Sequence, residues 1–342
     1  MRKGANPEKE NFNILIKNYH RIIIPIYIPH FEGYFSDSFE ILKLCIQSLL
    51  LTVHDKTRIT LYNNASHPLV KEYIDELYKK EDYIDQVFHS KENLGKINAY
   101  LSAAKSNVEP LITVTDADVF FKNNWQSSVE KIFIDFKEAG MVSPVPSSKA
   151  FKSFVDANWY YGFFKGKIRF KDVEDPEGLK NFDESLGNVK PLYDAIHLKQ
   201  YMVLSNKKNE AVMGCGHFLA TLRREVFDKG PNEPSYIKIH GGIENKFIDL
   251  PNEKLGFLRL ATKKNYAFHL GNTVEGWMYE EFHKITKSNE KPFEAEDFAN
   301  YKKYNFVQLK IGGVLSRILL SSFIKGKYFE KIGLKSTSPE KY

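Results

Sequence analysis

The chain has 342 residues, 42% of them hydrophobic, and its 49 Lys and Arg against 43 Asp and Glu give a formal net charge of +6. This length and apolar content allow a large core, which excludes a chain that is disordered throughout. Cys45 and Cys215 are too few for a disulfide framework, and no apolar run reaches the roughly 20 residues of a membrane-spanning helix. The stretch "MRKGANPEKENFN" lacks a secretory signal, so we expect a reduced, cytoplasmic protein.

The positive charge is concentrated at the C-terminal end. Between Tyr301 and Tyr342 nine Lys and Arg face two Glu, so the remainder of the chain is nearly neutral. Nucleic-acid binding calls for a basic surface across the folded domain. We therefore expect no nucleic-acid partner.

Four short apolar runs in the first third of the chain predict β-strands, at residues 21–28, 58–64, 84–90 and 110–116. Helix-period segments separate them. The first predicted helix has a capping-box-like start at Asp37 and Glu40 and one apolar face, formed by Ile41, Leu42, Cys45, Ile46, Leu49 and Leu50. Apolar strands without strict alternation, separated by helices, predict an α/β fold with a mostly parallel sheet covered on both faces.

Polar residues and prolines follow these predicted strands where ligands bind in such folds, at the carboxyl ends. They are Pro25 near the end of the first strand, then Asn63, Asn64 and Ser66 after the second. The stretch "TDADVFF" places Asp116 and Asp118 after the fourth. Two like charges so close repel unless a cation or a donor lies between them. In an extended segment Asp116 and Asp118 would point the same way and Ala117 toward the packed layer, so a shared divalent metal is the simplest explanation.

The middle of the chain has weaker patterns. Residues 144–210 are aromatic and charged with few clear periods, which indicates a variable insertion. Within it we interpret Trp159, Tyr160 and Tyr161 as core residues rather than a sugar-stacking platform. Residues 211–272 form a further globular stretch, and residues 273–342 are expected to be a basic helical region.

Several of these segments, in order, resemble motifs of the family 2 glycosyltransferases, which have the GT-A fold, a Rossmann-like sheet, and use nucleotide sugars. The resemblance covers about residues 22–272. Its motifs are "IIIPIYIP", "CIQSLLLT", "YNNAS", "NLGKINAYLSAAK", "TDADVFFKNNW", "GCGHFLATLRREVFDKG", "GGIENKF" and "FHLGN". It implies one GT-A domain over residues 1–272, with a nucleotide-binding part at 20–122, an acceptor-side insertion at about 144–210 and an acceptor and base part at 211–272.

The resemblance also implies roles for individual residues. Asp118 and His269 would bind Mn²⁺ or Mg²⁺, with Asp116 on a metal-bound water or the ribose, and Glu244 would be the catalytic base. An imidazole ligand favours Mn²⁺. The nucleotide contacts implied for this chain are Pro25, Asn63, Asn64, Ser66, Asn93, Gly95, Lys96 and Asp116.

Three departures separate the chain from the family pattern. Asn63 stands where the family usually has Asp, which weakens the expectation of a UDP-sugar donor. Asn245 replaces the usual aspartate after the base, and Ile243 is an extra residue before Glu244.

Each implied site residue also has a structural interpretation. Asn63, Asn64 and Ser66 are common turn formers, and Gly95 with Lys96 can be an ordinary start of a helix. His269 can be a hydrogen-bonded structural residue, and we interpret His217 of "GCGHFLA" in the same way rather than as a residue of the acceptor site. Glu244 can be an acid favoured by a helix dipole.

The function implied is a metal-dependent, inverting sugar transfer of hexosyltransferase type. The donor would be a nucleoside-diphosphate sugar and the acceptor a saccharide or lipid-linked saccharide, in surface polysaccharide assembly. The alternative is a catalytically silent GT-A protein that binds a nucleotide or glycan as a partner subunit, which the departures at Asn63 and Asn245 motivate.

The basic C-terminal region contains an amphipathic helical pattern. Its apolar face comprises Ile311, Val314, Leu315, Ile318 and Leu319, and the cations beside it are Lys310, Arg317, Lys325 and Lys327. Such a helix can lie on an anionic membrane surface, which would make the protein peripheral on the inner face of the plasma membrane. The alternative is a helix packed on the catalytic domain.

Overall fold

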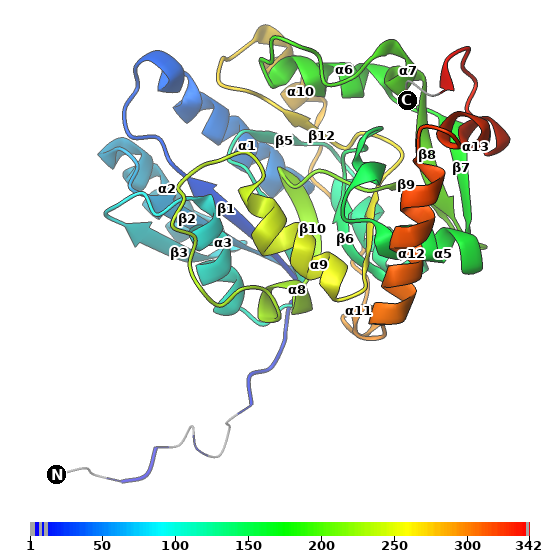
Figure 1. Cartoon of the computed structure of the whole chain (residues 1–342). Coiled ribbons are helices and arrows are strands. Elements are labelled where there is room, and N and C mark those ends of the chain that lie inside the picture. Colours follow the sequence, from blue (N-terminus) through cyan, green and yellow to red (C-terminus); the bar gives the residue numbers. More distant parts are fainter. Residues whose placement is uncertain (1–3, 7–8, 10–12, 340–341) are drawn as a thin grey trace.

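The computed structural model describes residues 4–6, 9, 13–339 and 342. Within these residues ten strands form one central sheet, in the order β3-β2-β1-β4-β10-β6-β11-β9-β8-β7, and β5 pairs with β12 in a separate ribbon (Figure 1). Seven strands run in the direction of β1, while β7, β9 and β10 run the opposite way. This architecture confirms the predicted α/β fold with a mostly parallel sheet.

The first four strands of the main sheet are parallel and match the four predicted ones. They are β1 (His20–Ile26), β2 (Thr57–Asn64), β3 (Ile84–Ser90) and β4 (Leu111–Thr115). The register places Ile26 of β1 opposite Asn63 of β2, and His20 opposite Leu111 of β4. The carboxyl ends of these strands therefore meet at one edge of the sheet.

The rest of the sheet contains all of its antiparallel pairs. β10 (Leu219–Arg223) lies between β4 and β6 (Ala139–Ser143), and β11 (Leu258–Ala261) pairs parallel to β6. The outer strands are β9 (Glu210–Met213), β8 (Gln200–Ser205) and β7 (Lys167–Asp172). β7 and β8 come from the segment predicted to be an insertion, so that segment extends the central sheet.

Helices cover both faces of the sheet because successive side chains of each strand point to opposite sides. Ile22 and Ile24 of β1 pack with α1 (Ser38–Thr52), α2 (Pro68–Lys80) and α4 (Trp125–Asp135). Ile23 points the other way, into the core that includes α3 (Lys96–Lys105) and α8 (Glu225–Asp228). This two-sided burial explains why β1 is a continuous apolar run.

The start of α1 differs from the predicted capping box. Asp37 occupies the N-cap position but makes no side-chain cap bond. Its carboxylate instead accepts a hydrogen bond from the backbone N–H of Val274 at 2.9 Å, and Glu40 accepts one from Tyr279 at 3.1 Å. These acids join α1 to the chain around α10 (Gly276–Lys284).

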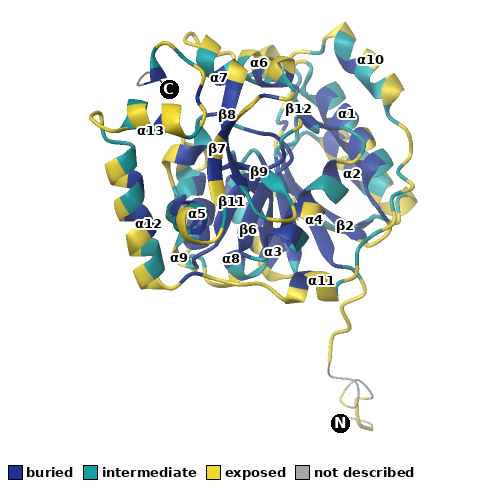
Figure 2. Cartoon of the chain, turned by 90° about the vertical axis from the view of Figure 1, so that its right-hand side faces the viewer, coloured by how far each residue is buried: buried dark blue, intermediate teal, exposed yellow. Residues whose placement is uncertain are grey.

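The C-terminal region is helical and packed against the sheet domain. It comprises α10, α11 (Glu296–Ala299), α12 (Phe306–Leu319) and α13 (Lys325–Lys331), and α12 lies along α5 (Asp156–Phe164) (Figures 1 and 2). Tyr342 is buried, and its hydroxyl donates to the carbonyls of Ser148 and Gln200 at 3.0 and 2.8 Å. None of the helices among the described residues combines the length and apolarity needed to cross a membrane.

Candidate active site

A cavity of about 530 Å³ opens at the carboxyl ends of β1, β2 and β4. Eight of the residues singled out in the sequence line it: Pro25, Asn64, Asn93, Gly95, Lys96, Asp116, Asp118 and His269. Aromatic and aliphatic side chains form much of the remaining wall. An apolar cavity with a few convergent polar groups is typical of a small-molecule site.

The two aspartates lie on a turn rather than on an extended segment. Asp116 follows β4, whereas Ala117 and Asp118 form the turn before β5 (Val119–Phe121). Ala117 packs against the hydrophobic core, as expected, and also lines the cavity. Both carboxylates still reach the same cavity because the turn bends across the end of the sheet.

The ribbon β5–β12 brings His269 to Asp118. His269 ends β12 (Ala267–His269), is paired with Val119, and is followed by Leu270, whose N–H donates to the Asp118 carbonyl at 2.7 Å. His269 Nε2 lies 3.5 Å from Asp118 Oδ2, and its Nδ1 is 2.9 Å from the Ser185 hydroxyl. Asp118 and His269, which are 151 positions apart in the sequence, thus lie close together in the wall of the cavity.

One carboxylate oxygen of Asp118 stands out chemically. Oδ1 is buried and has no hydrogen-bond partner among the described residues. Burial raises the pKa of Asp118 above its ordinary value; His269 opposes this shift and the Asp116 carboxylate reinforces it. An unpartnered buried oxygen beside an imidazole nitrogen is the donor set that a divalent cation such as Mn²⁺ accepts.

Lys96 joins Asp116 to Glu244. Its ammonium nitrogen lies 3.0 Å from Asp116 Oδ1 and 2.7 Å from Glu244 Oε1. Burial opposes the charge on Lys96, but the two carboxylates outweigh it and raise its pKa. The Tyr100 hydroxyl also donates to Asp116 Oδ1, at 3.3 Å. Asp116 Oδ1 therefore accepts hydrogen bonds from two side chains of the protein, whereas Asp118 Oδ1 accepts none from the described residues.

Glu244 is buried and does not line the cavity itself. It directly precedes the π-helical turn η4 (Asn245–Asp249), a form that is rare and often found at functional sites. Its Oε2 lies 3.7 Å from His217 Nε2, and His217 Nδ1 lies 3.2 Å from Oδ2 of the fully buried Asp249. Glu244 and Asp249 thus contact the two ring nitrogens of His217, and Lys96 connects Glu244 to the cavity.

Asn64 and Asn93 shape the loop that leads into α3. Asn64 donates to Asn93 Oδ1 and accepts from the Leu94 N–H, both at 2.9 Å. The Gly95 N–H donates to Asn93 Oδ1 at 2.9 Å. Gly95 has φ +81°, and a Cβ there would lie 2.8 Å from the Lys238 carbonyl oxygen. Glycine is therefore needed where the loop before Glu244 crosses the start of α3.

Asn63 and Ser66 do not line the cavity. The Asn63 amide nitrogen is 3.0 Å from His89 Nδ1, and its oxygen accepts from the Ser66 N–H at 2.9 Å. The Ser66 hydroxyl donates to the Ile26 carbonyl and accepts from the Ile28 N–H. Ser66 thus ties the turn after β2 to the end of β1, and Asn63 joins that turn to His89 of β3, so their nucleotide contacts remain predictions.

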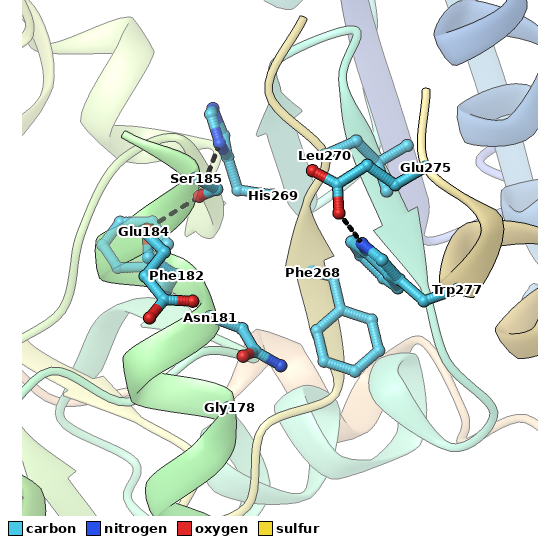
Figure 3. Close-up of a pocket in the computed structure, with 10 residues that line it drawn as sticks. All are labelled: Gly178, Asn181, Phe182, Glu184, Ser185, Phe268, His269, Leu270, Glu275 and Trp277. Atoms are coloured by element: carbon cyan, nitrogen blue, oxygen red, sulfur yellow. Dashed lines mark hydrogen bonds between the residues drawn. The ribbon is translucent and has the colours of Figure 1, made fainter. Parts of the chain in front are cut away.

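His269 also lines a second cavity, of about 350 Å³ (Figure 3). It is bounded by α6 (Pro176–Ser185), β12 and the start of α10. Phe268 and Trp277 form an aromatic wall with ring centroids 5.5 Å apart, and the Trp277 indole N–H donates to Glu275 at 2.8 Å. Asn181 and Glu184 of α6 add polar groups. His269 is therefore common to both cavities.

Sequence reasoning missed several residues that line the first cavity. Tyr27, Tyr34 and Phe35 supply aromatic surface, and Lys238 brings a positive charge from the loop before Glu244. Tyr27 stands inside the quoted motif "IIIPIYIP", which was a usable signal. Ser185, whose hydroxyl contacts His269, comes from a segment without clear periodicity, so the sequence offered no signal for it.

His20, His54 and Glu130 form a buried cluster with spacing suited to a metal, at the opposite end of β1. Glu130 Oε1 lies 2.7 Å from His20 Nδ1 and 2.9 Å from His54 Nε2. However, the Lys56 N–H donates to His54 Nδ1 at 3.2 Å, so a neutral His54 must carry its proton on Nε2 and donate it. We interpret this cluster as a hydrogen-bonded core network.

The family model described as "Glycosyl transferase family 2" matches residues 21–230. This match covers more than half of the chain, including both aspartates of the cavity. The chain belongs to glycosyl transferase family 2. No protein among the curated sequences matches this family 2 glycosyltransferase at a significant level.

Solved structures resemble the family 2 chain at low identity. The mannosyltransferase PcManGT from Pyrobaculum calidifontis, in complex with GDP-Man and Mn²⁺, is 12% identical with a TM-score of 0.41; the match covers 72% of this chain and 54% of that one. GalNAc-T7 with UDP, GalNAc and Mn²⁺ is 17% identical with a TM-score of 0.47, and the match covers 76% and 45%. TarS 1-349 of S. aureus is 11% identical with a TM-score of 0.43, and the match covers 89% and 73%. The chain thus spans about half the length of the first two proteins.

Proposed function

We propose that this family 2 glycosyltransferase moves a sugar from a nucleoside-diphosphate sugar to a saccharide acceptor, with a divalent cation bound by Asp118 and His269. The observation that carries the proposal is the buried, unpartnered oxygen of Asp118 beside His269 in the cavity at the strand ends. A cation there would act as a Lewis acid and stabilise the negative charge of the leaving diphosphate. The imidazole favours Mn²⁺ over Mg²⁺.

The donor would lie in the first cavity. Tyr27, Tyr34 and Phe35 offer aromatic surface for the base and ribose, and Pro25, Asn64 and Asn93 lie on the same rim. Lys96 and the N–H groups at the start of α3 would meet the diphosphate together with Gly95. Ser66 would contribute by holding the end of β1 in place and Asn63 by holding the turn that contains Ser66, with a uridine donor only weakly favoured.

Glu244 would accept the proton of the attacking acceptor hydroxyl. Lys96 contacts Oε1, so the proton would go to Oε2, which faces His217. Asp249 would keep the imidazole of His217 oriented from the far side. Direct attack by the acceptor inverts the anomeric carbon, and general base catalysis of this kind contributes about 10²–10⁴-fold.

The acceptor saccharide would bind in the second cavity. Its aromatic wall suits the C–H face of a sugar ring, and Asn181, Glu184 and Glu275 can pair with hydroxyl groups. The acceptor can be a free or lipid-linked saccharide. The assignment to surface polysaccharide assembly in the cytoplasm rests on the family resemblance alone.

The variant Glu244→Gln tests the proposal, with Glu76→Gln on the exposed face of α2 as a matched control. We expect Glu244→Gln to lose at least about 100-fold in sugar transfer while it binds nucleotide like the wild type, since Gln still accepts from Lys96 but cannot take a proton. Transfer and nucleotide affinity are measured on the same preparations. Wild-type transfer in Glu244→Gln would contradict the role of the base. Nucleotide binding without transfer in the wild type would favour the silent partner subunit.

A further inference from the structure

The helix α12 is packed in an unusual orientation. The residues that it buries are Gly312, Gly313 and Ser316, the smallest on the helix. A Cβ on Gly312 would lie 2.0 Å from the Asp156 carbonyl oxygen, so α12 and α5 approach with their backbones nearly in contact. Only small residues allow two helices to come this close.

The bulky apolar residues of α12 point away from the protein. Phe306, Val307, Ile311, Val314 and Ile318 are 39–70% exposed, and Phe323 in the following turn is 91% exposed. At 3.6 residues per turn the exposed positions of α12 span roughly 140° of the helix. We call these residues, with Ile324, the outer face of α12. Of the apolar face predicted from the sequence, Ile311, Val314 and Ile318 are exposed, whereas Leu319 packs against the core.

The outer face is positively charged as well as apolar. Lys310 and Arg317 lie on the same exposed side of the helix. Between Phe298 and Phe329 the sequence contains six Lys and Arg and no Asp or Glu; Lys303 pairs with Glu225 at 2.7 Å, and the other cations are Lys302, Lys310, Arg317, Lys325 and Lys327. The cores of protein–protein interfaces are depleted of Lys, whereas an anionic lipid surface attracts a cluster of cations.

We propose that the outer face of α12 binds the surface of an anionic membrane and holds the protein there as a peripheral protein. The apolar side chains enter the boundary between headgroups and acyl chains, and the cations pair with lipid phosphates. The glycine contact with α5 fixes the helix to the domain, so the face is presented without any unfolding. Figure 2 shows α12 at the edge of the molecule, with exposed residues along its length, where a flat surface can reach it. This inference does not depend on sugar transfer.

Vesicle binding of the full chain tests the proposal. We expect cosedimentation with vesicles of phosphatidylcholine and phosphatidylglycerol, weaker binding to phosphatidylcholine alone, and loss of binding as NaCl is raised. Replacing Ile311, Val314 and Ile318 together by Ser should lower the partition coefficient by about tenfold or more, because less apolar surface is buried. Leu69→Ser with Val189→Ser, exposed apolar residues elsewhere, is the matched control and should bind like the wild type.

A second variant tests the charge independently. Lys310→Gln with Lys327→Gln should weaken binding to the phosphatidylglycerol vesicles and leave binding to phosphatidylcholine unchanged, whereas Lys79→Gln with Lys91→Gln should change neither. Equal binding of the wild type and the Ser variant would overturn the proposal, as would a wild type that does not sediment with either vesicle. A wild-type dimer that the Ser variant converts to a monomer, without vesicles, would assign the face to a second copy of the chain instead.

Discussion

Lys96 is the residue that links the proposed base to the aspartate pair. Its ammonium group contacts Asp116 and Glu244 at 3.0 and 2.7 Å while remaining largely buried. Removing one partner of such a pair leaves a charge without compensation in a poorly solvated place. The stability of the site therefore depends on all three groups together.

A double-mutant cycle of Lys96→Met and Glu244→Gln should give a coupling energy of about 1–3 kcal/mol in urea unfolding, because the two groups are in direct contact. The same cycle on the exposed pair Lys80 and Glu76 is the control and should give a clearly smaller coupling energy, because water screens the two charges. Equal coupling energies for the two pairs would show that Lys96 and Glu244 do not stabilise each other in solution.

Eight of the residues that line the cavity could be predicted from the sequence, several because their motifs follow strands whose ends must converge and His269 through the family resemblance. Asp116, Asp118, Lys96 and His269 all line the cavity as expected. The partners of each group were not predictable. Nothing in the sequence indicates that Lys96 pairs with Asp116 while Asp118 keeps a free oxygen, since that division depends on the turn at Ala117.

At the scale of elements, the contact between α12 and α5 depends on Gly312. Gly312→Ala should lower the free energy of unfolding by about 1–3 kcal/mol or more, since the added methyl group would meet the Asp156 carbonyl and push the helices apart. Gly276→Ala at the start of α10 has open space around it and is the matched control. Chemical unfolding of both variants measures the difference. A Gly312→Ala variant as stable as the control would rule out the close packing.

The contact between Glu253 of α9 (Leu250–Lys254) and the start of α5 should make the free energy of unfolding depend on pH. Glu253 accepts the Asp156 N–H at 2.9 Å through Oε1, while its other oxygen is buried without a partner among the described residues. Burial raises the pKa of Glu253 from 4.5 to about 8, and Asp156 reinforces the shift. Between these values the unfolded chain loses a proton that the folded protein keeps, so stability falls as pH rises from about 4.5 to about 8.

Glu253→Gln should flatten this part of the stability profile, because Gln fills the same space and does not ionise. Urea unfolding at a series of pH values measures the slope, and the exposed Glu76→Gln should leave it as in the wild type. Identical slopes in Glu253→Gln and the wild type would mean that Glu253 ionises normally in the folded state.

At the scale of the whole molecule, the parallel half of the sheet was predictable and the antiparallel half was not. β1 to β4 are apolar runs separated by helices, and all four match the predicted ranges within two residues. β7 alternates between exposed and buried residues along most of its length, whereas β8, β9 and β10 are almost wholly buried. Their pairing is decided by contacts between distant segments, such as β10 entering between β4 and β6. The pairing of β5 with β12, which brings His269 to Asp118, also depends on contacts between distant segments.

Calorimetric titration of nucleoside diphosphates and nucleotide sugars, with Mn²⁺ and with EDTA, tests the central claim most directly. The wild type and Asp172→Asn, an exposed control, should bind one nucleotide in Mn²⁺ and lose that binding in EDTA, whereas Asp118→Asn should bind at least about tenfold more weakly in Mn²⁺. Wild-type affinity of Asp118→Asn in Mn²⁺, or nucleotide binding that EDTA leaves unchanged, would contradict a metal site at Asp118 and His269.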